Sequence, residues 1–136
     1  MELKFRVNNF SRIRKSLKEN DARFLCRRKE IYIYLKDGNK LTRYQGKYFY
    51  VTIRKKNSMF LLKKRKITKK EHQFLISRGI KKILNNSRLI YKIGSTEIST
   101  NEMEVGKFVI LDGGRNIQFA KKLGLRNRIT KPFSEL

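Results

Sequence analysis

Alternation of apolar and polar side chains constrains the fold of this chain more than any other feature of its sequence. Residues 2–7 place three apolar side chains on one side and three charged side chains on the other, which is the period of a half-buried β-strand. Helical spacing predicts three helices, at residues 10–20, 68–79 and 116–123. The pattern predicts a single antiparallel α+β domain over residues 1–136. The other segments of strand character are residues 30–36, 47–55, 59–67, 87–93, 96–99 and 107–112.

Turn and cap signals mark the ends of several of these segments. Lys56-Asn57-Ser58 is expected to be the turn of a hairpin. Thr68, with Glu71 three residues later, has the form of a capping box at the start of the second helix. Gly79 and Gly124 follow the second and third helices, as glycines at helix C-termini do. These signals support the predicted order of strands and helices.

The two faces of the predicted sheet differ in chemistry. On residues 47–55, Phe49, Val51 and Ile53 form an apolar face that the helices would cover. The opposite face is rich in tyrosine and basic residues, including Arg54. Two interpretations stay open from the sequence, because this second face either is exposed to solvent or lines the inside of a barrel.

The charge of the chain predicts a polyanionic partner. Its 136 residues include 35 Lys and Arg against 11 Asp and Glu, which gives a net charge of +24 and a pI near 10.6. The hydrophobic content of 39% is enough for one modest core, which excludes a disordered tail. Lys, Ile and Asn are abundant and Pro is rare, a bias typical of an AT-rich genome. Part of the basic excess can therefore come from codon usage.

Cysteine and histidine counts exclude several kinds of site. Cys26 is the only cysteine, so the chain has neither an internal disulfide nor a Cys-rich zinc site, and we expect a structural thiol. His72 has no ligand partner at a suitable spacing except the adjacent Glu71, and we expect it on the surface of a helix. No apolar run has the length of a signal peptide core or a membrane span. We therefore expect an intracellular, cytoplasmic protein with no membrane partner.

Eight short motifs follow one another along the chain. They are residues 1–7 (MELKFRV), 10–17 (FSRIRKSL), 28–32 (RKEIY), 50–54 (YVTIR), 60–64 (FLLKK), 74–80 (FLISRGI), 86–91 (NSRLIY) and 105–112 (VGKFVILD). In this order they resemble the ExExKF strand, first helix, QxDxYF, LRIR, basic strand, lLxxlGf helix, KxRxxY and LGxFvEiE segments of the CYTH domain. That domain defines the triphosphate tunnel metalloenzymes, which include class IV adenylate cyclases, thiamine triphosphatase and RNA 5′-triphosphatases. The resemblance covers nearly the whole chain.

The resemblance implies a tunnel of eight antiparallel strands, in which Lys and Arg bind a triphosphate and Glu pairs bind a divalent metal. We therefore predict an antiparallel sheet curled into a complete or incomplete tunnel-like barrel, flanked by about three helices. Acidic positions of the family are lost, since the first Glu of ExExK would precede Met1, an RxExE strand is missing and EIE has become Ile110-Leu111-Asp112. The basic positions are kept as Lys4, Arg54, Lys63 or Lys64, and Arg88.

This balance of charges predicts a nucleic-acid-binding protein that is not an enzyme. Loss of the metal-binding acids indicates a degenerate tunnel with no catalytic residues, no metal and no cofactor. We expect DNA in preference to RNA, bound mainly through the phosphate backbone with low sequence specificity. The expected phosphate-binding residues are Lys4, Arg12, Arg14, Lys15, Arg54, Lys55, Lys56, Lys63, Lys64, Arg65, Lys66, Lys69 and Arg88, with Arg23, Arg27, Arg28 and Lys29 as further candidates.

Two other functions stay open. A minimal metal-dependent RNA 5′-triphosphatase, or another triphosphate hydrolase, would use Glu2, Glu30 and Asp112 to bind Mg²⁺ or Mn²⁺. A small basic subunit of a ribosome or transcription complex would have its charge neutralised by neighbouring RNA or DNA. The sequence determines neither the oligomeric state nor the biological process.

Overall fold

The computed structural model describes residues 2–57 and 59–136. Met1 of the first motif and Ser58 of the predicted hairpin turn lie outside the described residues. The elements are β1 (Glu2–Val7), α1 (Ser11–Glu19), β2 (Arg23–Leu35), β3 (Lys40–Tyr44), β4 (Lys47–Lys56), β5 (Met59–Ile67), α2 (Lys69–Ser77), β6 (Ile80–Ile93), β7 (Thr96–Met103), β8 (Gly106–Asp112), α3 (Asn116–Lys122), β9 (Asn127–Ile129) and the 3-10 helix η1 (Phe133–Glu135).

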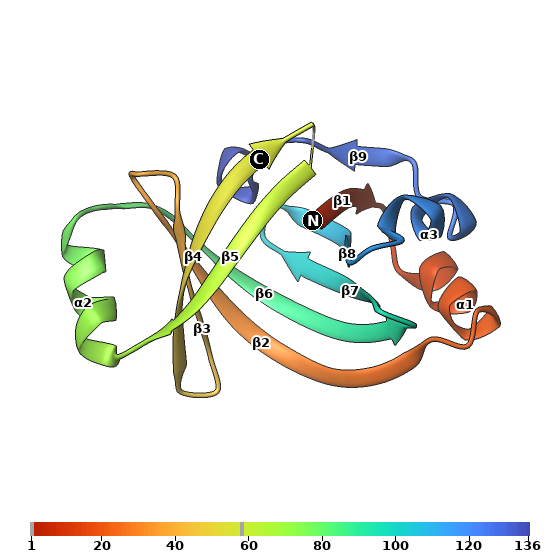
Figure 1. Ribbon diagram of the computed structural model, residues 1–136, viewed down its shortest axis with the longest axis horizontal. Coiled ribbons are helices and arrows are strands. Elements are labelled where there is room, and N and C mark those ends of the chain that lie inside the picture. The colour runs from red at the N-terminus through yellow and green to blue at the C-terminus, as the bar shows by residue number, and fades with distance from the viewer. Residues whose placement is uncertain (1, 58) are drawn as a thin grey trace.

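Eight strands of the described chain close into an antiparallel barrel, with β9 as an additional strand (Figure 1). Neighbours around the barrel follow the order β5-β4-β3-β2-β6-β7-β8-β1, and β1 pairs back to β5. This return pairing joins Glu2 to Phe60, while Lys4 and Arg6 on the same edge of β1 pair with β9. The predicted α+β barrel is therefore confirmed, and it is closed.

Four barrel strands depart clearly from the prediction, and one of them, β7, runs to Met103 instead of ending at residue 99. β3 was not predicted, and it completes the eight strands although the resemblance indicated that one strand is missing. β2 and β6 are longer than predicted because they pair with each other from Arg23 and Lys92 to Leu35 and Ile80. Register shifts interrupt this long pairing near both of its ends. Such bulges bend a strand and increase its twist, which helps a long ribbon to curl into a barrel.

Helices cover the outside of the barrel at its two ends (Figure 1). α1 and α3 share a buried cluster with the outer faces of β1, β7 and β8, in which Phe5, Ile13 and Leu111 take part. α2 lies at the opposite end, where Leu75 packs against a cluster that includes Ile33. The apolar residues of β1 and β2 thus face the helices, as their alternation predicts.

The barrel interior is divided into an apolar part and a polar part. Tyr34, Leu84, Met103, Phe108 and Phe133 belong to one buried cluster in the apolar part. Phe133 comes from η1, and its ring centroid lies 4.8 Å from that of Phe108. The C-terminal segment therefore fills one part of the interior, and the remaining part carries the polar side chains.

β4 faces the opposite way from the prediction. Val51 is buried on the inner surface, opposite Lys64 of β5, whereas Tyr48 and Tyr50 lie outside against the cluster beneath α2. Arg54 is on the same side as these tyrosines and is exposed. Both faces of β4 contact other residues, so its alternation alone does not show which face points inward.

Two predictions about α2 had different outcomes. The capping box is confirmed, because Glu71 N donates to Thr68 Oγ1 (3.1 Å) and Thr68 N donates to Glu71 Oε1 (3.3 Å). The surface position of His72 is wrong, because its ring is buried 4.6 Å from that of Tyr48. The outward-facing tyrosine of β4 supplies the apolar surface on which the imidazole packs.

No helix in the described residues has the length and apolar character needed to cross a lipid bilayer.

Candidate functional site

A cavity of about 380 Å³ occupies the polar part of the barrel interior. All eight barrel strands contribute to its lining. Phe133 and Ile110, which are both buried, form part of its apolar boundary. Acidic and basic side chains are equally represented in the lining, so the strong positive charge of the chain is not concentrated there. The charged lining residues are Glu2, Arg28, Glu30, Lys40, Lys64, Arg88, Glu97 and Asp112.

Three of the carboxylates occupy paired positions on neighbouring strands. Glu2 of β1 is opposite Asp112 of β8, and Asp112 is opposite Glu97 of β7. Residues that are directly opposite in antiparallel strands project from the same face, with Cβ atoms about 5 Å apart. These three residues therefore form a row on the inner surface, here called the carboxylate wall. Like charges in such positions destabilise a sheet, so a bound cation would stabilise this one.

Basic side chains occupy the other strands around the cavity. Arg28 of β2, Lys40 of β3, Lys64 of β5 and Arg88 of β6 are here called the basic wall. The Nε atom of Arg88 is buried and makes no hydrogen bond within the described residues, whereas the buried Nε of Arg28 forms an ion pair with Glu30 Oε2 at 3.4 Å. Buried donors without an acceptor are costly, and guanidinium groups bind phosphate oxygens well. The basic wall is therefore suited to a phosphate-containing anion.

Glu30 holds the two arginines of the basic wall in place. It is 2% exposed, and its Oε1 accepts hydrogen bonds from Tyr32 Oη (2.6 Å) and Arg88 Nη1 (3.3 Å). Its Oε2 lies 3.4 Å from Arg28 Nε. Asn86 Nδ2 extends the network by donating to Tyr32 Oη (2.8 Å). Glu30 was predicted as a metal ligand under the hydrolase alternative, but the structure surrounds it with arginine and tyrosine donors.

Burial and neighbouring charges shift the pKa of several cavity groups. Burial raises the pKa of Glu2, although Lys40 opposes this effect. Burial lowers the pKa of Lys40, although Glu2 opposes it. Burial also acts to raise the pKa of Glu30, but Arg88 and the other donors around the carboxylate outweigh it, and the pKa is lowered. A divalent cation near Glu2 and a phosphate near Lys40 would each favour the charged form that burial disfavours.

Lys4 lies beside the cavity and contacts the C-terminal segment. Its Nζ donates to Lys131 O (2.8 Å) and lies 4.0 Å and 4.2 Å from the ring centroids of Phe60 and Phe133. Burial lowers the pKa of Lys4 from 10.5 to about 8. Its role in phosphate binding stays a prediction, because Lys4 is not part of the cavity lining and its ammonium group already donates to Lys131 O.

Lys4→Met should flatten the pH dependence of stability at alkaline pH. In wild type, the unfolded chain binds more protons than the folded chain between the folded pKa of about 8 and the unfolded value of 10.5, so stability rises with pH in this window. The free energy of unfolding of wild type minus that of the variant should therefore increase by about 3 kcal/mol across it. Urea unfolding of both proteins at a series of pH values measures the difference. A difference that stays constant with pH would contradict the lowered pKa.

Most of the predicted phosphate-binding residues lie outside the cavity. Lys64 and Arg88 line it, but Lys63 faces outward, on the opposite side of β5 from Lys64. Arg54, expected on the tunnel wall, lies on the outer side because β4 faces the opposite way. The structure thus separates residues that the basic motifs place together. The remaining predicted residues are all exposed, and they are Arg12, Arg14, Lys15, Lys55, Lys56, Arg65, Lys66 and Lys69.

Two charged cavity residues were not predicted from the sequence. Glu97 lies in a predicted strand, but its position became evident only from its register opposite Asp112. The alternation of Glu97, Ser99 and Asn101 along β7 was the available signal of an inward polar face. Lys40 was missed because β3 itself was not predicted.

Comparisons with known proteins identify the fold. No family model and no curated protein sequence matches the chain. The PH1012 protein of Pyrococcus horikoshii has 22% identity and a TM-score of 0.78, covering 100% of this chain and 98% of that one. A Vibrio parahaemolyticus protein described as "a putative adenylate cyclase" has 17% identity and a TM-score of 0.74, covering 99% and 95%. One from Bacillus halodurans with the same description has 9% identity and a TM-score of 0.67, covering 98% and 94%. The chain has the triphosphate-tunnel, or CYTH, fold.

The comparisons correct the prediction that the chain is not an enzyme. Two structures with the triphosphate-tunnel fold carry the name of an enzyme, adenylate cyclase, so the fold is an enzyme fold. The prediction relied on a shortage of acids in the tunnel, and it overlooked Glu97. With Glu97 included, the carboxylate wall contains three acidic side chains.

The carboxylate wall of the triphosphate tunnel has the ligand type that hard divalent cations prefer. Mg²⁺ and Mn²⁺ bind carboxylate oxygens, and Glu2, Glu97 and Asp112 supply them from adjacent strands. In the described residues, no three Asp, Glu, His or Cys side chains are gathered around one point. Glu97 Oε1 instead lies 3.3 Å from Arg88 Nη2. The residues match a divalent cation in ligand type and strand register, and their carboxylates would have to turn toward one point to bind it.

Proposed function

We propose that the tunnel binds a terminal triphosphate together with a divalent cation and hydrolyses it. The observation that carries this proposal is that the carboxylate wall and the basic wall line one cavity of about 380 Å³. A triphosphate requires several cationic donors, whereas its metal ion requires carboxylate oxygens. Enzyme names on two proteins of the same fold support a catalytic role in addition to binding.

The two walls would have different roles. The basic wall would bind and orient the phosphate oxygens, with its arginines positioned by Glu30. The carboxylate wall would hold Mg²⁺ or Mn²⁺, which neutralises phosphate oxygens and lowers the pKa of bound water. In hydrolysis, the oxygen of water bonds to the terminal phosphorus, and the bond from that phosphorus to the bridging oxygen breaks. The products are orthophosphate and the diphosphate, and the proton released from water passes to solvent.

Product analysis tests this proposal. The purified protein is incubated with ATP or tripolyphosphate, with and without Mg²⁺ or Mn²⁺, and the phosphate products are separated. Orthophosphate release that requires the divalent cation supports the hydrolase. Pyrophosphate with a cyclic nucleotide would instead identify a cyclase and overturn hydrolysis. Absence of any product with both substrates and both cations would also contradict the proposal.

A second candidate function is nucleic-acid binding on the outer surface, with DNA as the expected partner. Exposed basic residues gather on the β4–β5 hairpin, and among the described residues the salt bridge from Arg65 to Glu71 (3.2 Å) is the one ion pair of this group. A cationic stripe with so few acidic neighbours favours contacts with the phosphate backbone. The group, here called the hairpin patch, comprises the outward-facing residues Arg54, Lys56, Lys63 and Arg65.

Salt dependence should reveal whether the hairpin patch binds DNA. If about six phosphates are neutralised, the slope of log K against log salt concentration should be about −5, and Lys56→Gln with Lys63→Gln should make it less steep by about 2. Fluorescence anisotropy with a labelled duplex measures both slopes. The matched control is Lys121→Gln with Lys122→Gln on α3, where both lysines are also exposed. No binding near physiological salt, or equal slopes for the two double variants, would contradict this role.

A further inference from the structure

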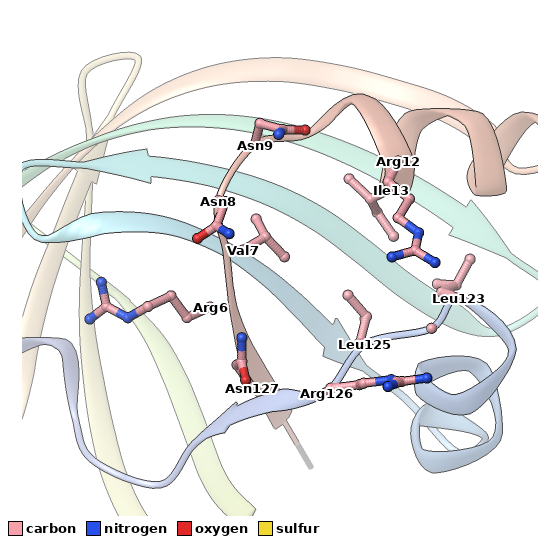
Figure 2. Close-up of a pocket in the computed structure, with 11 residues that line it drawn as sticks. Arg6, Val7, Asn8, Asn9, Arg12, Ile13, Leu123, Leu125, Arg126 and Asn127 are labelled. Carbon is pink, nitrogen blue, oxygen red and sulfur yellow. The ribbon is translucent and has the colours of Figure 1, made fainter.

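A second cavity, of about 400 Å³, lies outside the barrel (Figure 2). It is formed by the end of β1, the first turn of α1 and the segment that joins α3 to β9. None of its residues lines the tunnel cavity. Any ligand bound there would therefore be held by groups that the proposed hydrolase does not use.

The floor of this cavity is apolar and belongs to the outer core. Ile13 is 3% exposed and Leu123 is 5% exposed, and both are members of the cluster between the helices and the barrel. Val7 and Leu125 are partly buried and pack against the same cluster. The floor is therefore held by well-packed residues and provides a fixed surface for an apolar ring.

The rim of the cavity is basic and rich in amides. Arg12 and Arg126 are exposed, and Figure 2 shows their side chains on the two sides of Leu125. Arg6 points away from them, and its Nη1 donates to Val105 O (3.1 Å). The lining contains no Asp or Glu. Cations without an acidic neighbour favour an anionic ligand.

The start of α1 adds to the attraction for an anion. Its N-cap residue, Phe10, makes no side-chain capping bond, and the first turn contains no acid. Amide groups at a helix N-terminus carry a partial positive charge. Asn9 Oδ1 accepts a hydrogen bond from Ser11 N (3.1 Å), so the Asn9 side chain keeps its NH₂ group as a donor. Asn8 and Asn127 place two further amides at the rim.

We propose that this cavity binds a phosphorylated nucleoside. Arg12 and Arg126 would bind the phosphate, and the base would lie on the apolar floor with the Asn amides at its edge. A hydrated inorganic anion would use the arginines but not the floor, whereas a neutral apolar ligand would leave the cationic rim without a partner. The phosphorylated nucleoside is either a free mononucleotide or the terminal nucleotide of a nucleic acid strand, and both present the same chemistry.

Calorimetric titration of the full chain tests this site with AMP, orthophosphate and a short 5′-phosphorylated single strand. AMP should bind at least about tenfold more tightly than orthophosphate, since the floor adds contact area that phosphate lacks. Arg12→Gln with Arg126→Gln should weaken AMP binding at least about tenfold, because both phosphate contacts are lost. Arg12 and Arg126, and Arg78 of the control below, are all exposed, so their substitution should not affect folding. The matched control is Arg78→Gln, at the end of α2 on the opposite side of the molecule.

The outcomes separate this site from the tunnel and identify the source of the nucleotide. Lys64→Gln, in the basic wall, should leave AMP affinity unchanged, whereas it should weaken tripolyphosphate binding. Equal affinities for AMP and the strand indicate that the natural ligand is a free mononucleotide. If the strand binds more tightly than AMP, and Arg12→Gln with Arg126→Gln weakens that binding, the natural ligand is a strand terminus. Three results would overturn the proposal: AMP binding no tighter than orthophosphate, an unchanged double variant, or loss of AMP binding on Lys64→Gln. Each is independent of whether the tunnel hydrolyses triphosphates.

Discussion

Asp112→Asn should reduce cation-dependent phosphate release at least about 100-fold, which corresponds to about 3 kcal/mol of transition-state stabilisation. Asp112 is the middle member of the carboxylate wall, with Glu2 opposite it on one side and Glu97 on the other. Asparagine keeps the size of the side chain but removes the negative charge that a divalent cation requires. Because Asp112 is exposed at the end of β8, the thermal midpoint should change little. Rates measured over a series of Mn²⁺ concentrations should show a higher requirement for the cation.

Glu102→Gln is the matched control for Asp112→Asn. Glu102 is an exposed acid of β7 that faces outward, and its Oε1 lies 3.9 Å from Lys107 Nζ. Its substitution by glutamine therefore removes the same charge without changing the tunnel. Its activity should stay within about twofold of wild type. Equal activities of Asp112→Asn and wild type would refute a metal-binding carboxylate wall, and a similar loss in both variants would indicate a general effect of net charge.

Glu30→Ala should destabilise the protein by about 3–5 kcal/mol, which lowers the thermal midpoint by roughly 10 °C or more. Removal of this carboxylate leaves Arg28 and Arg88 partly buried without their shared anion, and it takes the acceptor from Tyr32. Since the pKa of Glu30 is lowered in the folded state from its ordinary value of 4.5, its contribution is complete above that value and is lost as pH falls through the folded pKa. The difference from wild type should therefore shrink in acid.

Glu30→Gln and added tripolyphosphate separate charge from packing in this experiment. The glutamine variant keeps the side-chain volume and an acceptor for Tyr32, so its loss should be smaller than that of Glu30→Ala. Tripolyphosphate should raise the thermal midpoint of Glu30→Ala more than that of wild type, because the anion restores negative charge beside the arginines. A Glu30→Ala protein as stable as wild type at neutral pH, or one that tripolyphosphate does not stabilise, would contradict the role assigned to this network.

The elements that could be predicted are those with a strong local signal. β1 begins and ends at the predicted residues, and the capping box of Thr68 and Glu71 fixes the start of α2. β3 could not be predicted, because a short strand held by neighbours on both sides has little pattern of its own. The extra lengths of β2 and β6 come from their mutual pairing, which joins residues far apart in the chain, from Leu35 with Ile80 to Arg23 with Lys92.

The candidate site was predictable in its chemistry but not in its arrangement. The motifs placed Lys64, Arg88 and Asp112 in a tunnel, where they lie. Arg54 was placed wrongly because alternation gives two faces without showing which points inward. Glu97 gained its importance from the register that sets it opposite Asp112, and register between strands is not encoded in either strand alone.

The seam between β1 and β5 has a consequence for solubility. Among the described residues, the pair of Glu2 with Phe60 closes the barrel there, and β9 pairs with Lys4, Phe5 and Arg6 on the same edge of β1. An uncovered edge strand offers free amide and carbonyl groups to another chain, which promotes intermolecular pairing and aggregation. The three residues of β9 therefore cover the edge of β1. Any change that detaches the C-terminal segment would expose that edge and promote self-association.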